Sequence, residues 1–575
     1  MKGSDLLARY LEHRGITHVF ELIGGTITYL LDSLHLHTSI HIISMHHEQG
    51  AGFAAEGFAR HTGLPGIAMA TSGPGATNLL TAIGSCYFDS TPALFITGQI
   101  NRDERKGDLP VRQLGFQETD IVAMARPITK AAILVDDPSD LPQVLEHAFD
   151  LALRGRPGPV LLDLPMEVQV ADLPEPAWCS GSASGSTTSG GEADSTPEAE
   201  AFLETALADL AHAERPLILA GGGIRVSGAI EPFRRFVAAL DVPVVHSLMG
   251  VDVLPSDDPN RIGLIGLYGN RWANIALCDS DCLLVLGSRL DSRQTGNDTT
   301  LFRGRRVLHH VDCDDAELNN RVKQCSTLRM DLGAFLRCGL RSPFLPLDCG
   351  AWRDHLVSCR RQWPDSGEVG TVSGINPNSL MHHLSAACPD AAAFVADVGQ
   401  HQMWAAQSLQ LREHQRFLTS GGMGAMGFAL PAAIGACLAA GRHPVVVIAG
   451  DGGFQINLQE LQTIRRNRLP IKMVVINNQC HGMVRQIQDV AFNARYQSTI
   501  WGYDAPSFTA VASAYGLPSA LVAEEAQLPQ ALAAMMTDPD SAFLLEVVID
   551  PAINAYPKAI AGRPLSEMEP LEKPH

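Results

Sequence analysis

Two short polar turns, each placed directly after an apolar run, carry residues suited to binding a metal ion. The apolar run 445–449 leads into Gly-Asp-Gly, with its carboxylate at Asp451, and the later run 472–476 leads into Asn-Asn, ending at Asn478. If both runs are strands of one parallel sheet, these side chains reach the same sheet edge, and the glycines let a ligand approach the backbone. Carboxylate, amide and carbonyl oxygens suit Mg²⁺ or Ca²⁺, and Mg²⁺ often completes its shell with phosphate oxygens. The pattern predicts a metal site that can hold a diphosphate.

The composition restricts the partners and the compartment. The net charge of −19 argues against nucleic-acid binding, which needs clustered Lys and Arg, so a metal ion rather than bulk charge has to neutralise a phosphorylated ligand. The 12 cysteines are scattered, with no CxxC pair. The N-terminus lacks the apolar core of a signal peptide, and no apolar run is long enough to span a membrane. We therefore expect a reduced, cytoplasmic protein without a membrane segment.

The elements that must position these residues are short, continuous apolar runs that alternate with helix-length amphipathic stretches. The predicted strands fall into three blocks: 66–71, 93–98 and 160–164; then 216–220, 242–245, 282–287 and 306–311; then 393–398, 445–449, 472–476 and 543–549. Continuous apolar runs indicate strands buried on both faces, as in a parallel sheet covered by helices. The predicted fold class is α/β, with three doubly wound domains.

The domain boundaries follow from composition. Residues 180–195 are almost entirely Gly, Ser, Thr, Ala and acidic residues, which is typical of a flexible linker. We predict a first domain at 1–175, a Gly/Ser-rich linker at 176–199, a central domain at 200–340, a linker at 341–374, a third domain at 375–550 and a C-terminal tail at 551–575.

Over nearly its whole length the chain resembles the acetohydroxyacid synthases, also called acetolactate synthases, of the thiamine-diphosphate enzymes. The two turns, with 24 residues between Gly-Asp-Gly and Asn-Asn, match the cofactor signature of those enzymes. Further matching segments are HEQGA at 47–51, TSGPGATN at 71–78, FQETD at 116–120, GRPGPV at 155–160, GQHQMWAAQ at 399–407, GGMGAMGF at 421–428 and GMVRQ at 482–486. The resemblance implies pyrimidine, central and diphosphate domains, in agreement with the three blocks.

The resemblance implies how the cofactor is held and activated. Glu48 matches the glutamate that hydrogen-bonds the pyrimidine and drives the proton relay. It acts in that family on a cofactor bound by the partner chain's third domain, which implies an obligate homodimer or homotetramer. Mg²⁺ would be bound by Asp451, Asn478 and the carbonyl of Cys480. The other implied cofactor contacts are Val398, Gly399, Gln400, His401, Gly424, Ala425, Met426, Gly452, Gly453 and Met483.

Within that set, Gln400 and His401 match residues that hold the diphosphate with neutral donors. Residues 424–426 match the cradle of the pyrimidine, with Met426 bending the cofactor. Around the reacting carbon, the resemblance implies Phe116, Gln117 and Gly25. Arg293 matches an arginine that binds the carboxylate of the acceptor keto acid, a pairing that guanidinium geometry favours.

A second cofactor question concerns the central domain. A glycine turn after the predicted strand 216–220 and a later acidic residue are typical of a dinucleotide site, although the pattern alone is weak. By resemblance, a redox-silent FAD would contact Gly222, Gly223, Leu248, Met249, Gly287, Arg289 and Asp312. Central domains of thiamine-diphosphate enzymes often lack flavin, so both states stay open.

Several residues near the expected substrate entrance depart from the family pattern. Ile487 replaces a Trp that presses on the acceptor and favours 2-ketobutyrate, and Met166 replaces a Lys. Ile23 replaces a Pro, and Cys-His at 480–481 is also unusual. With the cofactor residues intact, these changes favour the same chemistry on a different pair of substrates.

The sequence therefore predicts a thiamine-diphosphate-dependent carboligase, which joins an acyl group from pyruvate or another 2-oxo acid to a second carbonyl compound. The alternatives are a carboligase of the acetylacetoin synthase type, which cleaves an α-diketone, and a C–C hydrolase of diketones. A sulfoacetaldehyde-type acyl transfer to phosphate is a further variant. A non-enzymatic relative would have lost Glu48, Asp451 or Asn478, and all three are present. A flavin-reducing oxidase would be distinguished by bleaching of its flavin.

Overall fold

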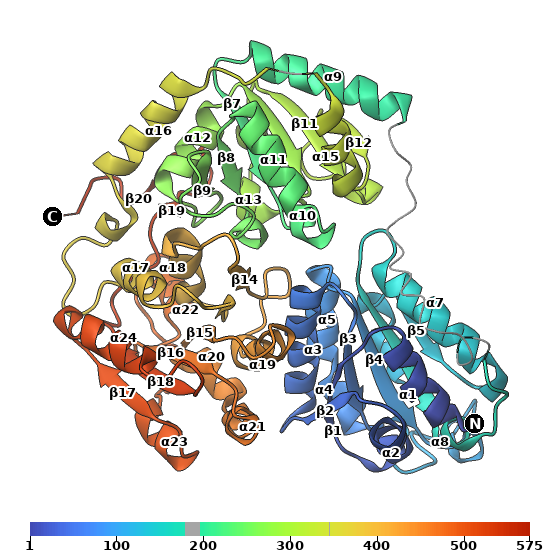
Figure 1. Ribbon diagram of the computed structural model, residues 1–575. Coiled ribbons are helices and arrows are strands. Elements are labelled where there is room, and N and C mark those ends of the chain that lie inside the picture. The colour runs from blue at the N-terminus through green and yellow to red at the C-terminus, as the bar shows by residue number, and fades with distance from the viewer. Residues whose placement is uncertain (177, 179–195, 344, 575) are drawn as a thin grey trace.

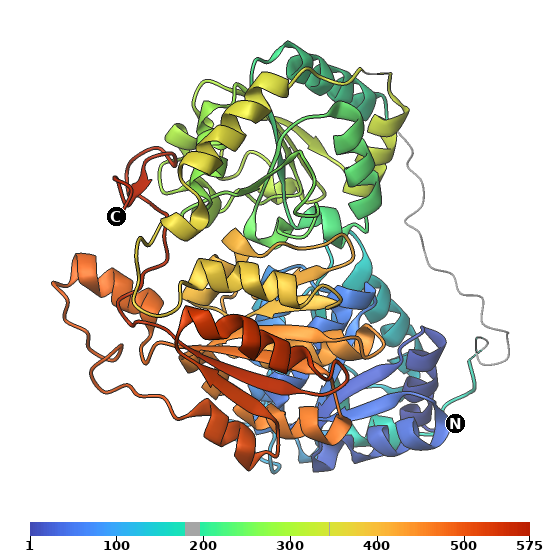
Figure 2. The same ribbon diagram turned by 60° about the vertical axis from the view of Figure 1, so that its left-hand side comes forward.

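A computed structural model describes residues 1–176, 178, 196–343 and 345–574 of the chain. They form three α/β domains, each built on a six-stranded parallel sheet covered by helices (Figure 1). In Figure 2 the first and third domains lie together below the central domain. The predicted fold class is confirmed, and the reason is the one the sequence gives: interior strands such as β3 and β4 are buried at every position, so apolar residues occupy both faces.

The first domain has the strand order β2-β1-β3-β4-β6-β5. Its strands are β1 (His18–Leu22), β2 (His41–Ser44), β3 (Gly66–Ala70), β4 (Ala93–Gln99), β5 (Ala131–Leu134) and β6 (Pro159–Pro165). Its helices are α1 (Gly3–His13), α2 (Thr28–His37), α3 (Glu48–Thr62), α4 (Pro74–Asn78), α5 (Leu80–Phe88), α6 (Ile121–Ala125), α7 (Leu141–Leu153) and α8 (Met166–Val170).

The central domain has the strand order β12-β11-β10-β7-β8-β9. Its strands are β7 (Pro216–Ala220), β8 (Val244–His246), β9 (Arg261–Leu264), β10 (Cys282–Leu286), β11 (Val307–Asp312) and β12 (Ser326–Arg329). Its helices are α9 (Pro197–His212), α10 (Gly223–Val226), α11 (Ile230–Leu240), α12 (Arg271–Asp279), α13 (Ser292–Thr295), α14 (Thr299–Arg303) and α15 (Leu332–Arg341).

The third domain has the strand order β14-β13-β15-β16-β18-β17. Its strands are β13 (Ala393–Ala396), β14 (Arg416–Leu418), β15 (Val445–Gly450), β16 (Ile471–Asn477), β17 (Ser519–Val522) and β18 (Phe543–Val548). Its helices are α17 (Pro377–Ala387), α18 (Gln400–Ser408), α19 (Ala429–Ala439), α20 (Asp451–Ile456), α21 (Leu461–Asn467), α22 (Gly482–Ala491), α23 (Phe508–Ala514) and α24 (Leu528–Met536).

The connecting segments differ from the sequence expectation in two places. The predicted linker 341–374 contains a helix, α16 (Gly350–Gln362), which packs on α12 and buries Trp352 and Leu356. Only these two side chains of the helix are buried, which gives little apolar periodicity, so the sequence pattern does not indicate the helix. The tail returns to the central domain through the antiparallel pair β19 (Lys558–Ala559) and β20 (Met568–Glu569). Most of the predicted Gly/Ser-rich linker, at 179–195, lies outside the described residues.

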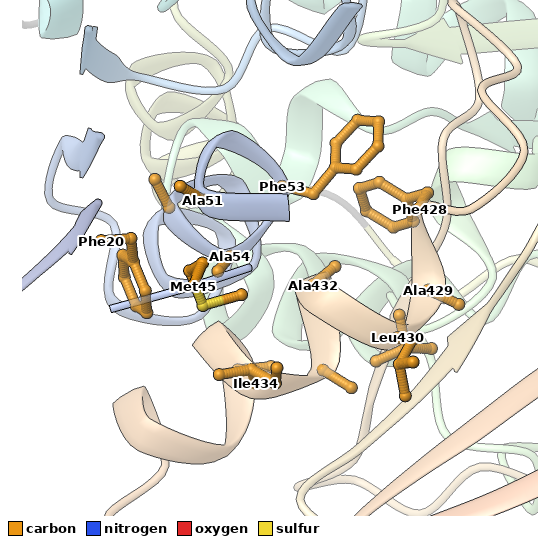
Figure 3. Packing of buried hydrophobic residues seen from close by; sticks show 14 of the residues in the cluster. Phe20, Met45, Ala51, Phe53, Ala54, Phe428, Ala429, Leu430, Ala432 and Ile434 are labelled. Carbon is orange, nitrogen blue, oxygen red and sulfur yellow. The ribbon is translucent and has the colours of Figure 1, made fainter. Parts of the chain in front are cut away.

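The first and third domains are joined by the packing of α3 against α19, shown in Figure 3. Phe53 meets Phe428 edge to face, with ring centroids 5.4 Å apart. Gly57 and Gly435 lie at the crossing: a Cβ at Gly435 would come within 1.8 Å of the Ala54 carbonyl oxygen, and one at Gly57 within 2.0 Å of the Ala432 carbonyl oxygen. The two backbones can therefore approach only because these positions carry no side chain.

Two further sequence expectations bear on the protein's environment. The 11 cysteines that the structure describes are all free thiols, as predicted. No helix within the described ranges is long and apolar enough to cross a membrane. The cytoplasmic location and the domain boundaries stay predictions.

Candidate cofactor and active site

The predicted metal ligands lie together at the carboxyl edge of the third sheet. Asp451 begins α20 directly after β15, and Asn478 follows β16. The two strands are parallel neighbours with Gly450 opposite Ile476, so the residues after them leave the sheet side by side. Both side chains are buried. The topology thus brings together two residues that helices α20 and α21 and strand β16 separate in the sequence.

Asp451 has an oxygen available for a ligand. Its Oδ1 accepts a hydrogen bond from the Gly452 amide at 2.8 Å, while Oδ2 is buried with no hydrogen-bond partner. Burial raises the pKa of Asp451 to about 6, although neighbouring backbone amides and the Tyr503 hydroxyl oppose that rise. A divalent cation would satisfy the free oxygen. The residues therefore fit the predicted Mg²⁺, whose binding stays a prediction.

The other two predicted ligands are oriented by local hydrogen bonds. The Oδ1 of Asn478 accepts from the Cys480 amide at 3.3 Å, and the Cys480 carbonyl accepts from the Gly482 amide at 3.0 Å. Burial raises the pKa of the Cys480 thiol to about 11, so this residue contributes its backbone and not a thiolate. Within the described ranges no three His, Cys, Asp or Glu side chains cluster as a metal site, so one carboxylate with neutral oxygens is the available donor set.

The start of α18 places neutral polar side chains beside the predicted metal ligands. The Asn478 Nδ2 donates to Gln400 Oε1 at 3.4 Å, so a hydrogen bond links α18 to one of the predicted metal ligands. His401 is buried, its Nε2 has no hydrogen-bond partner, and burial lowers its pKa to about 3. The ring is therefore neutral. Gly482 keeps the space open, since a Cβ there would come within 2.0 Å of Gln400 Oε1.

The predicted cradle at 424–426 is a loop with a constrained backbone. Gly424 has a φ of 66°, which favours glycine, and a Cβ placed there would have no atom within 4 Å. Met426 is half-buried. The end of the loop is held by Asp397, whose carboxylate accepts hydrogen bonds from the amides of Gly427 and Ala429, both at 3.0 Å. The remaining predicted contacts are on neighbouring segments: Val398 and Gly399 follow β13, Gly452 and Gly453 lie in the first turn of α20, Ala425 is in the loop, and Met483 is the second residue of α22.

Asp397 was missed by the sequence analysis. It is buried, and burial raises its pKa to about 6 while three backbone amides oppose the rise. A Cβ at Gly453 would come within 2.8 Å of its Oδ1, so the same carboxylate also lies against α20. The available signal was an Asp at the end of an apolar run, immediately before the segment that the family match highlighted.

Glu48 lies in the first domain, at the first position of α3, with 7% of its surface exposed. The Asn78 Nδ2 donates to its Oε2 at 2.9 Å, and Gly75 lies against Oε1, 3.3 Å from where a Cβ would be. Within the described part of the chain, no hydrogen bond joins this carboxylate to the third domain. Its neighbour Gln49 does reach that domain, because Gln49 Oε1 accepts from Asn457 at 3.2 Å.

The residues predicted around the reacting carbon gather at the carboxyl edge of the first sheet. Gly25 follows β1, and the adjacent Thr26 hydroxyl is 2.9 Å from the Thr71 hydroxyl, which ties this loop to the one after β3. Gln117 packs on Gly73, and its φ of 63° is in the left-handed region. Phe116 is 83% exposed. An apolar ring that is this exposed in one chain is available for a ligand or a second chain.

The three predicted substrate residues come from all three domains. Arg293 of the central domain has Nη2 3.9 Å from the sulfur of Met403 on α18, so it points toward the third domain. Ile487 on α22 is 46% exposed. Met166 begins α8 and is half-buried. The roles of these three residues stay predictions.

A cavity of about 1200 Å³ lies between the three domains and is lined by most of the predicted flavin contacts. Six of the seven line it: Gly222, Gly223, Met249, Gly287, Arg289 and Asp312. Leu248 does not, because it packs against the apolar core of the third domain. Gly221 and Gly287 touch, since a Cβ at Gly221 would come within 2.0 Å of the Gly287 carbonyl oxygen. The volume is sufficient for a dinucleotide, and the glycines allow a close backbone approach.

Comparison with known proteins places these features in a family. Residues 1–124 match the thiamine pyrophosphate enzyme N-terminal TPP binding domain, 203–338 the central domain, and 397–547 the C-terminal TPP binding domain. The chain is 37% identical to the acetolactate synthase isozyme 2 large subunit of Escherichia coli (strain K12), with all of both chains covered. It is 37% identical to the chloroplastic acetolactate synthase of Arabidopsis thaliana, covering 98% of this chain and 83% of that one. It is 36% identical to the acetolactate synthase large subunit of Lactococcus lactis subsp. lactis (strain IL1403), covering 98% and 96%.

Proposed function

Because this chain belongs to the acetolactate synthase family of thiamine-diphosphate-dependent enzymes, we propose that it is a carboligase that joins an acyl group from pyruvate or another 2-oxo acid to a second carbonyl compound. The observation that carries the proposal is the pairing of two half-sites at sheet edges. One holds the free carboxylate oxygen of Asp451 beside Asn478 and the neutral His401. The other holds the buried Glu48. The first suits a metal-bound diphosphate and the second a proton relay.

The chain's own residues support this chemistry by binding and by proton transfer. Thiamine diphosphate, when bound, would supply a nucleophilic carbon for the donor carbonyl and an electron-poor ring that stabilises the electron pair left by the departing carbon dioxide. Asp451, Asn478 and the Cys480 carbonyl would hold the Mg²⁺, and the uncharged Gln400 and His401 would bind diphosphate oxygens. Since Asn78 occupies Oε2 of Glu48, Oε1 is the atom available to hold or pass a proton.

The variant Glu48→Gln tests this proposal. The amide is isosteric and keeps an oxygen for Asn78, but it cannot exchange a proton as a carboxyl group does. We expect carboligation to fall by about 100-fold or more, the lower range of general acid–base effects. Circular dichroism and thiamine diphosphate binding are expected to stay near those of the unmodified protein. Substantial activity in this variant would contradict the assigned relay.

A product screen by mass spectrometry identifies the substrates. Pyruvate and butane-2,3-dione are each supplied with a panel of aldehydes, ketones and 2-oxo acids as acceptors. We expect products formed from pyruvate with loss of carbon dioxide. Products formed only from the diketone would instead identify the acetylacetoin synthase type, and release of the free acid without ligation would identify a hydrolase.

We also propose that the interdomain cavity binds FAD without a redox role. The proposal is supported by the six predicted contacts that line it. The purified protein is then expected to show flavin absorbance that anaerobic donor substrate does not bleach. Bleaching by substrate would indicate an oxidase, and colourless active protein would exclude a required flavin.

The proposed assembly is a homodimer or homotetramer in which each site combines the first domain of one chain with the third domain of its partner. It is supported by the family match and by the exposed apolar residues at Phe116 and along α22. Apolar side chains that are exposed in one chain are available to pack against a second copy.

A further inference from the structure

Two buried carboxylates cross between the first and third domains of the same chain, outside the residues assigned above. The first is Asp89, which directly follows α5. Its Oδ2 accepts from the Gly421 amide at 2.9 Å and its Oδ1 from the Gly422 amide at 2.7 Å, both in the third domain. The proposed pyrimidine cradle begins two residues later, at Gly424. A first-domain side chain thus fixes the backbone from which that cradle starts.

Asp89 is itself held by Arg60 on α3. Arg60 Nη2 lies 2.7 Å from Asp89 Oδ2 and 2.6 Å from Oε1 of Glu56. The same guanidinium donates through Nη1 to the carbonyl of Thr419 at 2.7 Å. Buried charges cost free energy unless they are paired, so Arg60, Asp89 and Glu56 are stable together only while each keeps its partners. Residues 419, 421 and 422 of the loop are therefore all tied to the first domain.

The second carboxylate, Glu460, makes the reverse connection, from the third domain to the first. It lies in the third domain immediately before α21 and is completely buried. Its Oε1 accepts from the amide of His46 at 3.0 Å, and Thr463 donates to its Oε2 at 2.7 Å. A Cβ at Gly50 would come within 2.8 Å of Oε1, so the first turn of α3 rests directly on this group. Glu48 lies between His46 and Gly50.

We propose that Asp89 and Glu460 are positioning residues that form a reciprocal clamp, in which each domain supplies one carboxylate that fixes the cofactor-facing segment of the other. The clamp rests on the proposed roles of Glu48 and of residues 424–426. Asp89 acts through the loop and therefore on cofactor binding. Glu460 acts through the start of α3 and therefore on the orientation of the Glu48 carboxyl group. Neither residue needs to touch cofactor or substrate.

The two halves of the clamp predict different kinetic signatures. Asp89→Ala leaves the Gly421 and Gly422 amides without their acceptor, and we expect thiamine diphosphate to bind about tenfold more weakly in the presence of Mg²⁺, which corresponds to about 1.4 kcal/mol. Its kcat at saturating cofactor is expected to change by less than about threefold. Glu460→Ala is expected to show the opposite split, with kcat lowered about tenfold and cofactor affinity changed by less than about threefold.

Conservative variants and a matched control separate positioning from general loss of stability. Asp89→Asn and Glu460→Gln each keep one oxygen acceptor, so they are expected to recover part, but not all, of the lost affinity and kcat, respectively. Glu368→Ala is the control, because Glu368 is also completely buried and paired with an arginine, Arg271, at 2.7 Å, but lies away from both segments. It is expected to lower the Tm while leaving cofactor affinity and kcat near the original values.

Calorimetry with thiamine diphosphate and Mg²⁺, steady-state kinetics and Tm are measured on the full-length protein. Unchanged affinity in folded Asp89→Ala together with unchanged kcat in folded Glu460→Ala would overturn the clamp, as would the same changes in Glu368→Ala. If an alanine variant does not fold, the amide variant decides: an intermediate loss supports the clamp and unaltered values overturn it. An unmodified protein that binds no thiamine diphosphate would instead refute the proposed function.

Discussion

At the scale of single residues, the candidate site is marked by buried polar atoms that have no partner within the described part of the chain. Asp451 Oδ2 and His401 Nε2 are both of this kind. Each such atom costs about 1–3 kcal/mol when it is left unpaired, and a bound ligand would satisfy both. A cation suits the first and a phosphate oxygen, with the ring as donor, suits the second.

The neutral state of His401 predicts how stability depends on pH. Its pKa in the folded protein is lowered to about 3 by burial, whereas an unfolded histidine has a pKa of about 6.5. The unfolded chain therefore binds the extra proton first, and stability is lost as the pH falls below about 6.5. Between pH 7.5 and pH 5 this residue accounts for a loss of about 2 kcal/mol in the free energy of unfolding.

Denaturant unfolding of the ligand-free protein at these two pH values measures that effect. His401→Gln is expected to lose about 2 kcal/mol less than the unmodified protein over the interval. The exposed His147 provides the control, His147→Gln, which is expected to leave the pH dependence unaltered. Equal pH dependence in His401→Gln and the unmodified protein would show that His401 is not buried in its neutral form.

Ile487 carries a prediction about acceptor choice. It is partly exposed on α22, at the position where the family typically has a Trp that presses on the acceptor. Ile487→Trp is expected to raise the preference for 2-ketobutyrate over pyruvate as acceptor by about tenfold, the scale of a small apolar contact. Competition between the two acceptors measures the ratio. Val490→Trp, on the same helix, adds the same ring at another exposed position and is expected to leave the ratio unchanged; equal shifts in both variants would remove the specific role of Ile487.

At the scale of elements, the crossing of α3 and α19 links the two cofactor-binding domains. Both helices are rich in Ala and Gly, their backbones approach closely at Gly57 and Gly435, and Phe53 meets Phe428 edge to face. Small residues at the crossing therefore determine how the loop 421–428 is placed relative to the start of α3. The reciprocal contacts of Asp89 and Glu460 connect the same two domains.

Gly435→Ala tests this packing. The new methyl group would overlap the Ala54 carbonyl oxygen, so the helices must separate, and we expect a loss of about 3 kcal/mol in stability. Gly350→Ala is the control, because a Cβ there would meet only Asp348 Oδ1, at 3.6 Å. It is expected to alter stability by less than about 0.5 kcal/mol. Thermal and denaturant unfolding measure both, and an equally small effect at Gly435 would contradict the tight crossing.

At the scale of the whole molecule, the two half-sites lie on separate domains, with Glu48 on the first and Asp451 on the third. If each site combines domains of two chains, a mixed dimer of Glu48→Gln and Asp451→Ala chains contains one site with both changes and one site with neither. Co-expression is then expected to restore about a quarter of the original activity, since half of the dimers are mixed and each has one intact site. Either variant alone is expected to be inactive.

Activity of the mixture reports directly on shared sites. Co-expression of Glu48→Gln with an untagged copy of itself provides the matched control, and it should restore nothing. The absence of recovery in well-mixed Glu48→Gln and Asp451→Ala dimers, verified with two affinity tags, would show that each site is completed within a single chain.

Much of the fold could be predicted from local patterns. Continuous apolar runs such as 216–220 coincide with a strand, and the others differ from their strands by one or two residues at the ends. Ends are harder to predict because they depend on the neighbouring strand: Asn477 belongs to β16 because it lies opposite Val548. Helix α16 escaped prediction because only two of its residues are buried. Asp397 escaped because its partners, Gly427 and Ala429, lie 30 and more residues away.

The sequence by itself determined the fold class, the family and the chemical types in the candidate site, because these depend on residue identity, on local periodicity and on ordered motifs along the chain. Only the tertiary structure decided which of those residues meet. Parallel pairing of β15 and β16 places Asp451 beside Asn478, and burial leaves one Asp451 oxygen free and His401 neutral. The tertiary structure also revealed the contacts of Asp89 and Glu460 across the domains. Burial and long-range hydrogen bonds arise from the folded packing of distant segments, and no local pattern of residues encodes them.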